Sequence, residues 1–504
     1  MNRSRPAITP VFPTRNRSKP RRPVWAAPML IALALSGCNL APAYSVPASS
    51  PARDDQSYKE DPMWKTAAPA DDIAKGEWWK LFGDPVLNDL EAKVAVTNQN
   101  VEYYRALYRE NSASVDADKA NLLPTVTATG DYSHSGSLQK HSGTSTSASA
   151  TASASWEPDL WGKLRNTVSQ SRAKAEASAA DLANATLSAQ ASLATDYLSL
   201  RAIDAQAAML DETIAGYRKA LEVTRNKFKA QTISEADVAS AQSTLSTALA
   251  SRRDLDRQRA SYENAIGMLI GENPSRFMLP VVPWAPVVPQ VPSILPSQIL
   301  QRRPDIASAE RAVAAANANI GIQKAAFFPD LTLSGSLGSD AGSLSKLFSI
   351  ASSVWSLGAD ASVTLLDFGA RSAKVRNARA AYDAAVASYR QSVLNAFQEV
   401  ETDLAAVAAY GAEQPDYVQA QASAVRAEQI TRNEYNAGTV DYTTVSSAQA
   451  TTYNARVSVI DNVLNQQTSA VSLIEAIGGH WQDAPQQVAL SPAAGTPRLG
   501  AAQK

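Results

Sequence analysis

Few side chains in this sequence could carry out chemistry. Cys38 is the only cysteine, so no disulfide can form within the chain. The three histidines, His134, His141 and His480, are not spaced as metal ligands, and the first two fall in a Ser/Gly-rich segment expected to be an exposed loop. The sequence has neither a G-x-S-x-G motif nor a glycine-rich phosphate loop. We therefore expect no enzyme activity, no catalytic residue, no metal and no cofactor.

The one reactive position is Cys38, at the end of an N-terminal targeting signal. An apolar run over 24–35, too short to span a bilayer comfortably, follows a basic stretch. The run ends in Leu-Ser-Gly-Cys at 35–38, which resembles the bacterial lipobox. The resemblance implies that residues 1–37 are a signal peptide and that Cys38 carries a diacylglycerol and an N-acyl lipid such as palmitate. Asn39 after it implies an outer-membrane destination. An ordinary signal peptide with an incidental cysteine is the alternative.

Composition restricts the kind of protein that this chain can form. Its 504 residues include 47 basic and 48 acidic side chains, a balance that does not suggest nucleic-acid binding. Aromatic residues make up only 7%, whereas Ala and Ser are abundant. This composition favours long helices packed through small side chains over several aromatic-filled cores.

The two halves of the chain repeat each other. Trp161-Gly162 matches Phe368-Gly369 at an offset of 207 positions, and an aspartate lies just before each pair. Two further matches have the same offset: 228–232 with 435–439, and 270–271 with 477–478. Leu123-Pro124 matches Phe328-Pro329 at an offset of 205, so a loop between 130 and 156 absorbs the difference. We predict the order helix, strand, loop, strand, long helix, turn, helix, occurring twice.

Four segments alternate between apolar and polar residues, as membrane strands or half-buried strands do. Each is about ten residues long, enough for a tilted strand to cross a bilayer. Four strands are too few to close into a barrel, and open edges in lipid are costly, so the sheet must close with copies of itself as a dimer, trimer or larger ring. A soluble sandwich, or disorder over 142–155, is the alternative. The segments are 125–132, 147–156, 331–337 and 355–365.

Two long segments rich in helix formers, 161–230 and 368–435, predict helices of roughly 100 Å. The second is interrupted only by Gly411 and Pro415. Shorter return helices are expected at 234–268 and 441–476. Gly438 is a natural left-handed helix terminator, and Ser234 and Asp441 are natural N-caps. A simple rod-like coiled coil would not explain the strands.

Three motifs are specific enough to indicate a family. They are Gly76-Glu-Trp-Trp-Lys-Leu-Phe-Gly-Asp-Pro-Val-Leu87, Trp156-Glu-Pro-Asp-Leu-Trp-Gly-Lys-Leu-Arg165, and the stretch from Leu295 through Arg302-Arg303-Pro304-Asp305 to Pro329. These motifs resemble those of TolC-like outer-membrane factors, in the NodT-type lipoprotein branch of pump-associated efflux ducts. Trp78, Trp79, Trp156, Trp161, Phe327 and Phe328 are expected either to pack or to lie at a membrane interface.

The resemblance implies a mainly α protein with membrane β structure. It implies a homotrimer with a 12-stranded barrel in the outer membrane and a twelve-helix cylinder, closed at its tip, in the periplasm. Such a passive duct exports small molecules received from an inner-membrane pump, commonly of the resistance-nodulation-division type, through a periplasmic adaptor. The expected divisions are a signal peptide (1–37), a lipid-anchored segment (38–85), a first repeat (86–271), an equatorial linker (272–295), a second repeat (296–480) and a flexible tail (481–504).

The charged motif Arg302-Arg303-Pro304-Asp305 also has a local interpretation. Pro304 fits the first turn of a helix, and Asp305 favours the positive helix end. The motif is therefore expected to be a structural salt-bridge cap.

The family resemblance also implies that the turns of the helical hairpins close the periplasmic mouth. The turn residues would be Thr232, Gly438 and Thr439. The gate candidates are Glu235, Asp237, Asp441 and Tyr442, because carboxylates near a symmetry axis repel one another and attract cations. The second tip departs from the family pattern: Ser446-Ser447-Ala-Gln-Ala450 stands where an aspartate and an arginine are usual. A constriction at Ser447 is therefore in doubt, and Asp441 could instead be only an N-cap.

Two other functions fit parts of the sequence. A periplasmic adaptor or scaffold lipoprotein can also have helical hairpins, but it does not need four strands of membrane length. A type I protein-secretion duct would share the architecture and differ only in its cargo. The lipobox favours the efflux branch by resemblance.

Overall fold

The computed structural model describes residues 39–48, 77–136, 144–289 and 303–479. The predicted order of elements occurs twice, and a short N-terminal helical segment precedes it. The elements of the first half are η2 (Trp78–Phe82), α2 (Pro85–Thr97), α3 (Gln99–Ala120), β1 (Thr125–Ser135), β2 (Ser145–Trp156), α4 (Lys163–Lys229) and α5 (Glu235–Leu269). Those of the second half are α7 (Pro304–Ala325), β3 (Asp330–Ala341), η3 (Leu344–Lys346), η4 (Ile350–Ser352), β4 (Ser353–Ser362), α8 (Ala370–Ala437) and α9 (Tyr442–Ala476).

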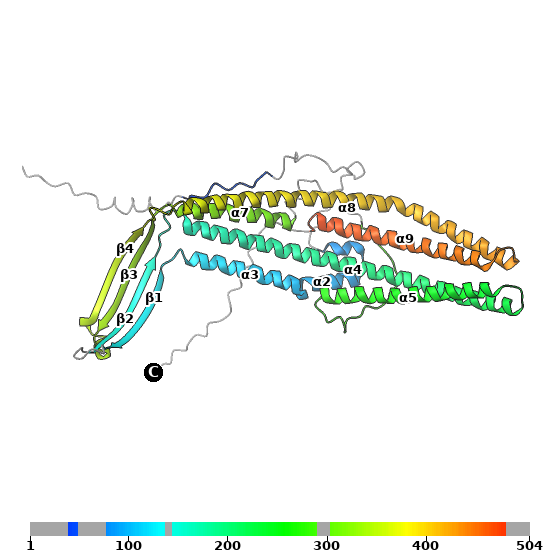
Figure 1. Ribbon diagram of the computed structural model, residues 1–504, viewed down its shortest axis with the longest axis horizontal. Coiled ribbons are helices and arrows are strands. Elements are labelled where there is room, and N and C mark those ends of the chain that lie inside the picture. Colours follow the sequence, from blue (N-terminus) through cyan, green and yellow to red (C-terminus); the bar gives the residue numbers. More distant parts are fainter. Residues whose placement is uncertain (1–38, 49–76, 137–143, 290–302, 480–504) are drawn as a thin grey trace, which may run out of the picture.

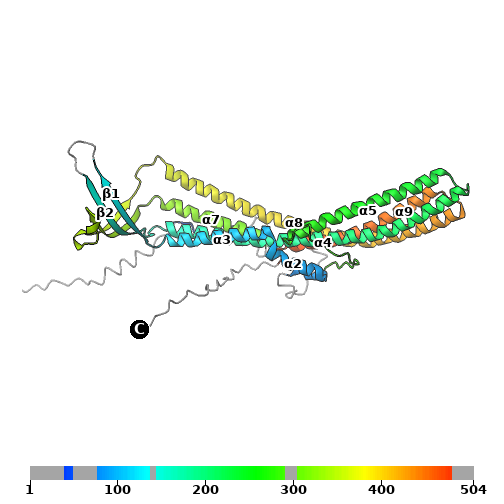
Figure 2. The same ribbon diagram turned by 90° about the horizontal axis from the view of Figure 1, so that it is seen from below.

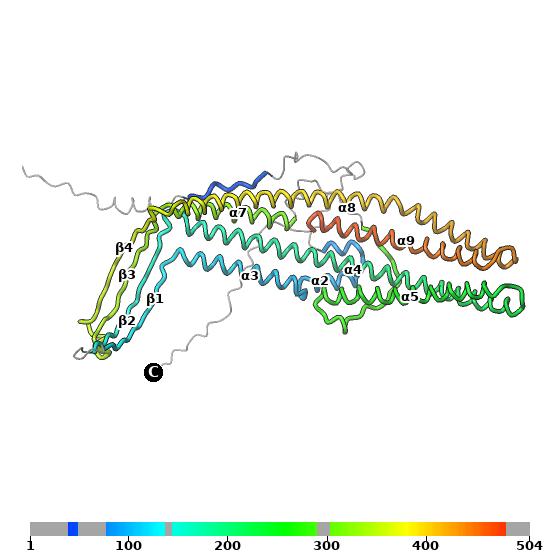
Figure 3. Tube along the Cα trace, viewed as in Figure 1, coloured from blue at the N-terminus to red at the C-terminus, as the bar shows by residue number. Residues whose placement is uncertain are grey.

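The subunit is elongated, with the sheet at one end and two helical hairpins at the other (Figures 1 and 2). The long helices α4 and α8 run the full length of the helical part. Along α4 lie α3 and then α5, and along α8 lie α7 and then α9, each pair end to end (Figure 3). The point where the shorter helices meet is called here the equatorial joint: the first joint is between α3 and α5, the second between α7 and α9.

The sheet has the order β1-β2-β3-β4, with all neighbours antiparallel. Its register aligns the alternating residues of all four strands. Val126 lies opposite Ala154, and Trp355 lies opposite Leu337, on the apolar face. Trp355 is 74% exposed, so this face has no partner within the subunit. The other face carries Ser, Thr and Asp side chains, as the alternation predicted.

The strands are longer than predicted at several ends, and the fourth ends earlier than predicted. The alternation suggested that the fourth strand continues to Leu365, but β4 ends at Ser362. Ser362 pairs with Asp330, the first residue of β3, so residues beyond it have no partner strand in the subunit. Alternation shows which face a side chain occupies, whereas a strand ends where its hydrogen-bonding partner ends.

The long helices form almost as predicted, and the interruption expected in the second does not break it. α8 continues through Pro415. Proline removes one backbone hydrogen bond and crowds the carbonyl four residues earlier, which here belongs to Gly411. No helix in the described part of the chain is both long and apolar enough to cross a membrane.

Two cores hold the helices together. The larger lies at the equatorial level and includes Trp78 and Trp79, each 5% exposed, so these two residues pack in the interior. Where α4 passes through it, Ala194 and Ala202 are fully buried, and small side chains there let neighbouring helices approach closely. The smaller core lies between the two hairpins near their tips and includes Tyr435 and Tyr442.

Candidate functional site

The first hairpin tip, between α4 and α5, is a tight left-handed turn. The amide of Thr232 donates to the carbonyl of Lys227 at 3.0 Å, which is the six-residue bond of a Schellman helix end. Gln231 has a φ of 59°, in the region that usually favours glycine. Ser234 then caps α5 in a capping box with Asp237. The predicted N-cap at Ser234 is confirmed.

The second tip, between α8 and α9, has the same geometry with a different residue at its centre. The amide of Thr439 donates to the carbonyl of Glu434 at 3.0 Å. Gly438 has a φ of 80° at the position that Gln231 occupies in the first tip. Asp441 caps α9 by accepting from the amide of Thr444 at 3.0 Å, so this N-cap prediction is also confirmed.

The three candidate gate carboxylates lie at these tips. Glu235 is exposed, and Asp237 is half-buried in its contact with Ser234. Asp441 is exposed and accepts from the hydroxyls of Thr443 and Thr444 at 2.6 and 2.8 Å. These hydrogen bonds, with that from Thr443 the largest influence, hold the pKa of Asp441 below its usual value. A gate around an axis involves several subunits, so the gate role stays a prediction.

Tyr442, the fourth gate candidate, is only 1% exposed. Its ring packs edge to face on Tyr435, with centroids 5.8 Å apart. Burial raises the pKa of Tyr442 to about 12. This placement favours a packing role inside the tip. Lys227, at the end of α4, lies 4.0 Å from the centroid of the Tyr435 ring and so joins the first hairpin to the second. Sequence reasoning did not identify this contact, because no local pattern relates residues so far apart.

The segment 446–450, which departs from the family pattern, contacts the first hairpin. The hydroxyls of Ser446 in α9 and Thr244 in α5 lie 2.8 Å apart. This contact is a second link between the two hairpins, whereas Ser447 is exposed.

At the second equatorial joint, Arg303 connects three helices. Pro304 begins α7, and Arg303 contacts the carboxylate of Asp305 through Nε and NH2 at 3.0 and 2.8 Å. Its NH1 donates to the carbonyl of Ala476, at the end of α9, at 2.8 Å, and it contacts Glu399 of α8 at 2.7 Å. The motif therefore holds the meeting helix ends together.

The same joint borders an acidic cavity that the sequence did not reveal. The cavity is about 470 Å³, and Glu399, Asp403 and Glu475 line it together with Arg303. Burial, helped by the charges of Glu399 and Glu475 and opposed by Arg303, raises the pKa of Asp403 to about 6. Burial also raises the pKa of Glu475. Glu399 and Asp403 lie one turn apart on α8, and the packing of α8 on α9 brings Glu475 to them.

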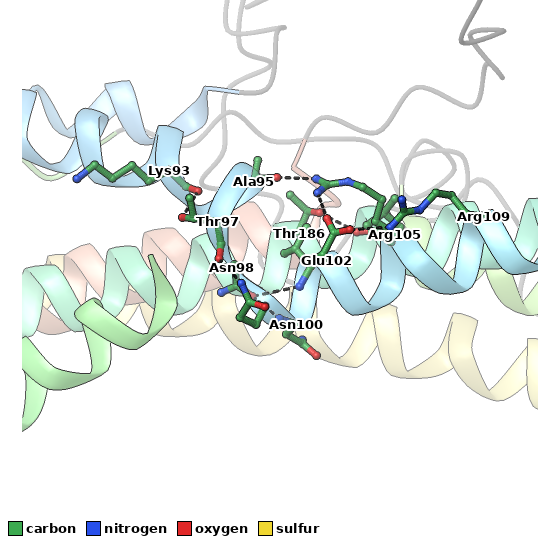
Figure 4. A network of polar contacts seen from close by, with 12 residues as sticks. Lys93, Ala95, Thr97, Asn98, Asn100, Glu102, Arg105, Arg109 and Thr186 are labelled. Atoms are coloured by element: carbon green, nitrogen blue, oxygen red, sulfur yellow. Dashed lines mark hydrogen bonds and ion pairs between the residues drawn. The ribbon is translucent and has the colours of Figure 1, made fainter. Parts of the chain in front are cut away.

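At the first equatorial joint, the neutral side chain of Asn98 holds the helix ends, beside the ion pairs that Glu102 makes with Arg105 and Arg109 (Figure 4). Asn98 caps α3 by accepting from the amides of Asn100 and Val101 at 2.9 and 3.1 Å. Its Nδ2 donates to the carbonyl of Leu269, at the end of α5, at 2.7 Å. The nearby Arg105 contacts Glu102 on the same helix, and the half-exposed Lys93 of α2 contacts Glu272, just after α5, at 3.0 Å.

Several predicted residues lie outside the described part of the chain. They are Cys38, Arg302, His141 and His480. His134 is described: it lies on β1, and its Nδ1 is 2.8 Å from the hydroxyl of Thr146 on β2. Among the described residues, no group of three or more His, Cys, Asp or Glu side chains could hold a metal ion.

Comparison with known proteins identifies the class of protein that this architecture represents. The family model for outer membrane efflux proteins matches residues 92–272 and 295–479. The probable efflux pump outer membrane protein TtgC of Pseudomonas putida is 30% identical over 490 residues, covering 93% of this chain and 98% of that protein. The cation efflux system protein CusC of Escherichia coli is 27% identical over 471 residues, covering 91% and 99%.

A solved structure agrees. The outer-membrane channel OprN superposes with a TM-score of 0.79 at 27% identity, covering 88% of this chain and 100% of that one. The chain therefore belongs to the outer membrane efflux protein family, whose members are transport ducts and not enzymes. Its fold is that of a trimeric TolC-like channel subunit, and it is an outer-membrane component of an efflux pump.

Proposed function

We propose that this chain is the passive duct of a tripartite efflux system. An inner-membrane pump of the resistance-nodulation-division type and a periplasmic adaptor would deliver small molecules to the helical end, and the homotrimer would release them outside. The names of TtgC and CusC, an efflux pump protein and a cation efflux system protein, support this assignment. The duct itself performs no reaction and needs no cofactor.

The observation that carries the proposal is the position of the two hairpins. The α4–α5 and α8–α9 tips lie side by side at the pole opposite the sheet (Figure 1). The Lys227–Tyr435 and Thr244–Ser446 contacts tie them together, so they form one surface at the periplasmic end. An adaptor would meet this surface.

We further propose that the covalent lipid on Cys38 anchors each subunit. Residues 1–37 would be removed, and 38–85 would lead from the lipid to the helical part. The repeats 86–271 and 296–480, the linker 272–295 and the tail 481–504 complete the proposed division. Cys38→Ser should abolish incorporation of labelled palmitate while leaving trimer formation in detergent intact. Retention of the label would reject lipidation at Cys38.

We also propose that Asp441, with Glu235 and Asp237, contributes to the closed periplasmic mouth. Asp441→Asn keeps a capping oxygen but removes the charge, whereas Asp441→Ala removes both. If the charge closes the mouth, the Asn variant should change single-channel conductance in planar bilayers as much as the Ala variant does. Conductance that changes only in the Ala variant would show that Asp441 is simply an N-cap.

Two experiments test the duct function: one measures resistance to toxic compounds, and the other measures crosslinking to an adaptor. Deletion of the gene should sensitise cells to several small toxic compounds, and expression of the protein should restore resistance. A photocrosslinker at Glu235 should capture a periplasmic adaptor, whereas one at Trp355, on the apolar face of the sheet, should not. Loss of secretion of a protein, with drug resistance unchanged, would favour the type I secretion alternative.

A further inference from the structure

The sheet has two open edges, and large apolar side chains lie near them at the helical end. In the described part of the chain, the outer edges of β1 and β4 have no partner strand. Phe368, just after β4, is 93% exposed, and Leu123, just before β1, is 66% exposed. In a trimeric barrel, β4 of one subunit must meet β1 of the next, because an open edge in lipid leaves backbone groups without hydrogen bonds.

The boundary between β2 and β3 shows how one repeat joins the next within the subunit. Trp161, just after β2, stacks on Phe328, just before β3, with ring centroids 4.7 Å apart. Its Nε1 donates to the carbonyl of Pro329 at 2.8 Å. An aromatic residue at the end of one repeat thus packs on an apolar-Pro pair at the start of the next.

The two repeats match in register as well as in sequence. Thr125 of β1 lies opposite Ser155 of β2, and Asp330 of β3 lies opposite Ser362 of β4. The first strands of these pairs are 205 positions apart and the second strands 207 apart, which are the offsets of the sequence repeat. β4 is therefore the structural copy of β2, and β1 is the copy of β3.

We propose that β4 pairs with β1 of the partner subunit in the register that β2 and β3 use within the chain. β2 and β3 place Ser155 opposite Ser334. Applying the two offsets places Ser362 opposite Thr129 of the partner subunit. It also places Phe368 in the position of Trp161, against Leu123 and Pro124 of the partner subunit.

The backbone at Phe368 is already fixed in one conformation within the subunit. Its φ of 50° is unusual for a residue other than glycine. The neighbouring Asp367 fixes that conformation by accepting from the amides of Gly369 and Arg371 at 3.1 and 3.0 Å. A fixed backbone that presents an exposed aromatic ring is suited to docking, because little conformational freedom is lost on contact.

The same register gives the seam between subunits a feature that the internal boundary lacks. β2 and β3 place Ser153 opposite Ser336 on the polar face. The corresponding residues at the seam are Asp360 and Asp131 of the partner subunit. Like charges directly opposite each other weaken a strand pair. The seam is thus expected to be weaker than the boundary inside the subunit.

Paired cysteines test the register directly in the purified full-length trimer. Directly opposite residues lie about 4.5–5.5 Å apart, within reach of a disulfide, whereas a two-residue shift places them about 7–8 Å apart. Ser362→Cys with Thr129→Cys should give disulfide-linked trimers after mild oxidation. Ser362→Cys with Thr127→Cys is the shifted control. Ser155→Cys with Ser334→Cys should oxidise within one chain and serve as the positive control.

These cysteine pairs test the strand register independently of whether the trimer forms. Cross-linking through position 129 at least tenfold faster than through position 127 supports the register. Faster cross-linking through position 127, or none at either position in a trimer whose internal control oxidises, overturns it. Phe368→Cys with Leu123→Cys tests the docking contact independently and should also link chains. Phe348→Cys with Leu123→Cys should not, because Phe348 lies beyond the opposite end of the sheet. Equal yields from these two pairs would reject the Phe368 contact.

Discussion

The two equatorial joints hold equivalent helix ends by different chemistry. In the first, the amide of Asn98 donates to the carbonyl of Leu269 at 2.7 Å. In the second, the guanidinium of Arg303 donates to the carbonyl of Ala476 at 2.8 Å. Leu269 and Ala476 are 207 positions apart, so the two donors satisfy the same backbone group in the two repeats.

The comparison shows that duplication has preserved the structural task while the residue that performs it has changed. The neutral amide of Asn98 satisfies the carbonyl of Leu269 without bringing a charge to the joint. A guanidinium brings in further charges: Arg303 contacts Glu399, and Asp403 and Glu475 face the same cavity. The second joint is therefore expected to depend on pH and to be strongly destabilised by the loss of its donor. The hydrogen bond that Asn98 makes at the first joint involves no charge, so its loss should cost less.

The largest expected effect comes from removing the two donors. Arg303→Ala leaves the carbonyl of Ala476 without its donor and the carboxylates of Asp305 and Glu399 without their cation, which should cost about 3–5 kcal/mol. Asn98→Ala removes an N-cap and one hydrogen bond and should cost about 1–2 kcal/mol. Hydrogen exchange of the amides at the ends of α9 and α5 would measure the free energy of local opening at each joint. Equal costs would contradict the distinction between the joints.

The next effect is a pH dependence at the second joint. The pKa of Asp403 is raised to about 6, so the joint is most stable when this carboxyl is protonated and loses stability as pH rises from about 4 through 6. Because the group is partly exposed, the loss should be about 1–2 kcal/mol. Asp403→Asn should match the wild type near pH 4 and exceed it at pH 7. A constant difference across this range in hydrogen exchange at the end of α9 would exclude the titration.

Much of the fold could be predicted from sequence because local patterns determine it. The alternating strands, the stretches rich in helix formers and the capping residues Ser234 and Asp441 are all signals that a short window contains. The repeat offsets of 205 and 207 added the order of elements and agree with the register of the sheet.

What the sequence could not give is the set of contacts between distant segments. Nothing in the sequence around Asp403 shows that it faces Glu475 of α9 across a cavity. Nothing around Lys227 shows that it packs over the ring of Tyr435. Tyr442 was a gate candidate because of its position at the turn, yet it is buried, since position along a chain does not determine which way a side chain faces.

The two hairpin tips provide a smaller test of the same comparison. Gln231 and Gly438 occupy the same left-handed position, with φ values of 59° and 80°. Glycine adopts this conformation without strain, so Gln231→Gly should stabilise the first tip and Gly438→Gln should destabilise the second, each by about 1 kcal/mol. Hydrogen exchange at Thr232 and Thr439 would show the two shifts. Shifts of the same sign would mean that side-chain contacts, and not backbone conformation, control the tips.

The smallest expected effect is on the stability of the proposed β4–β1 seam between subunits, compared with the β2–β3 boundary within a subunit. If Asp360 faces Asp131 of the partner subunit, removing the charges as Asp131→Asn with Asp360→Asn should strengthen each seam by about 0.2–1 kcal/mol. The temperature at which the trimer dissociates in detergent should rise, and the rise should shrink at high salt, which screens exposed charges. When two charges repel each other, either single substitution already relieves the repulsion, so the second substitution should add little. Full additivity of the two single variants would therefore show that these aspartates do not meet across the seam.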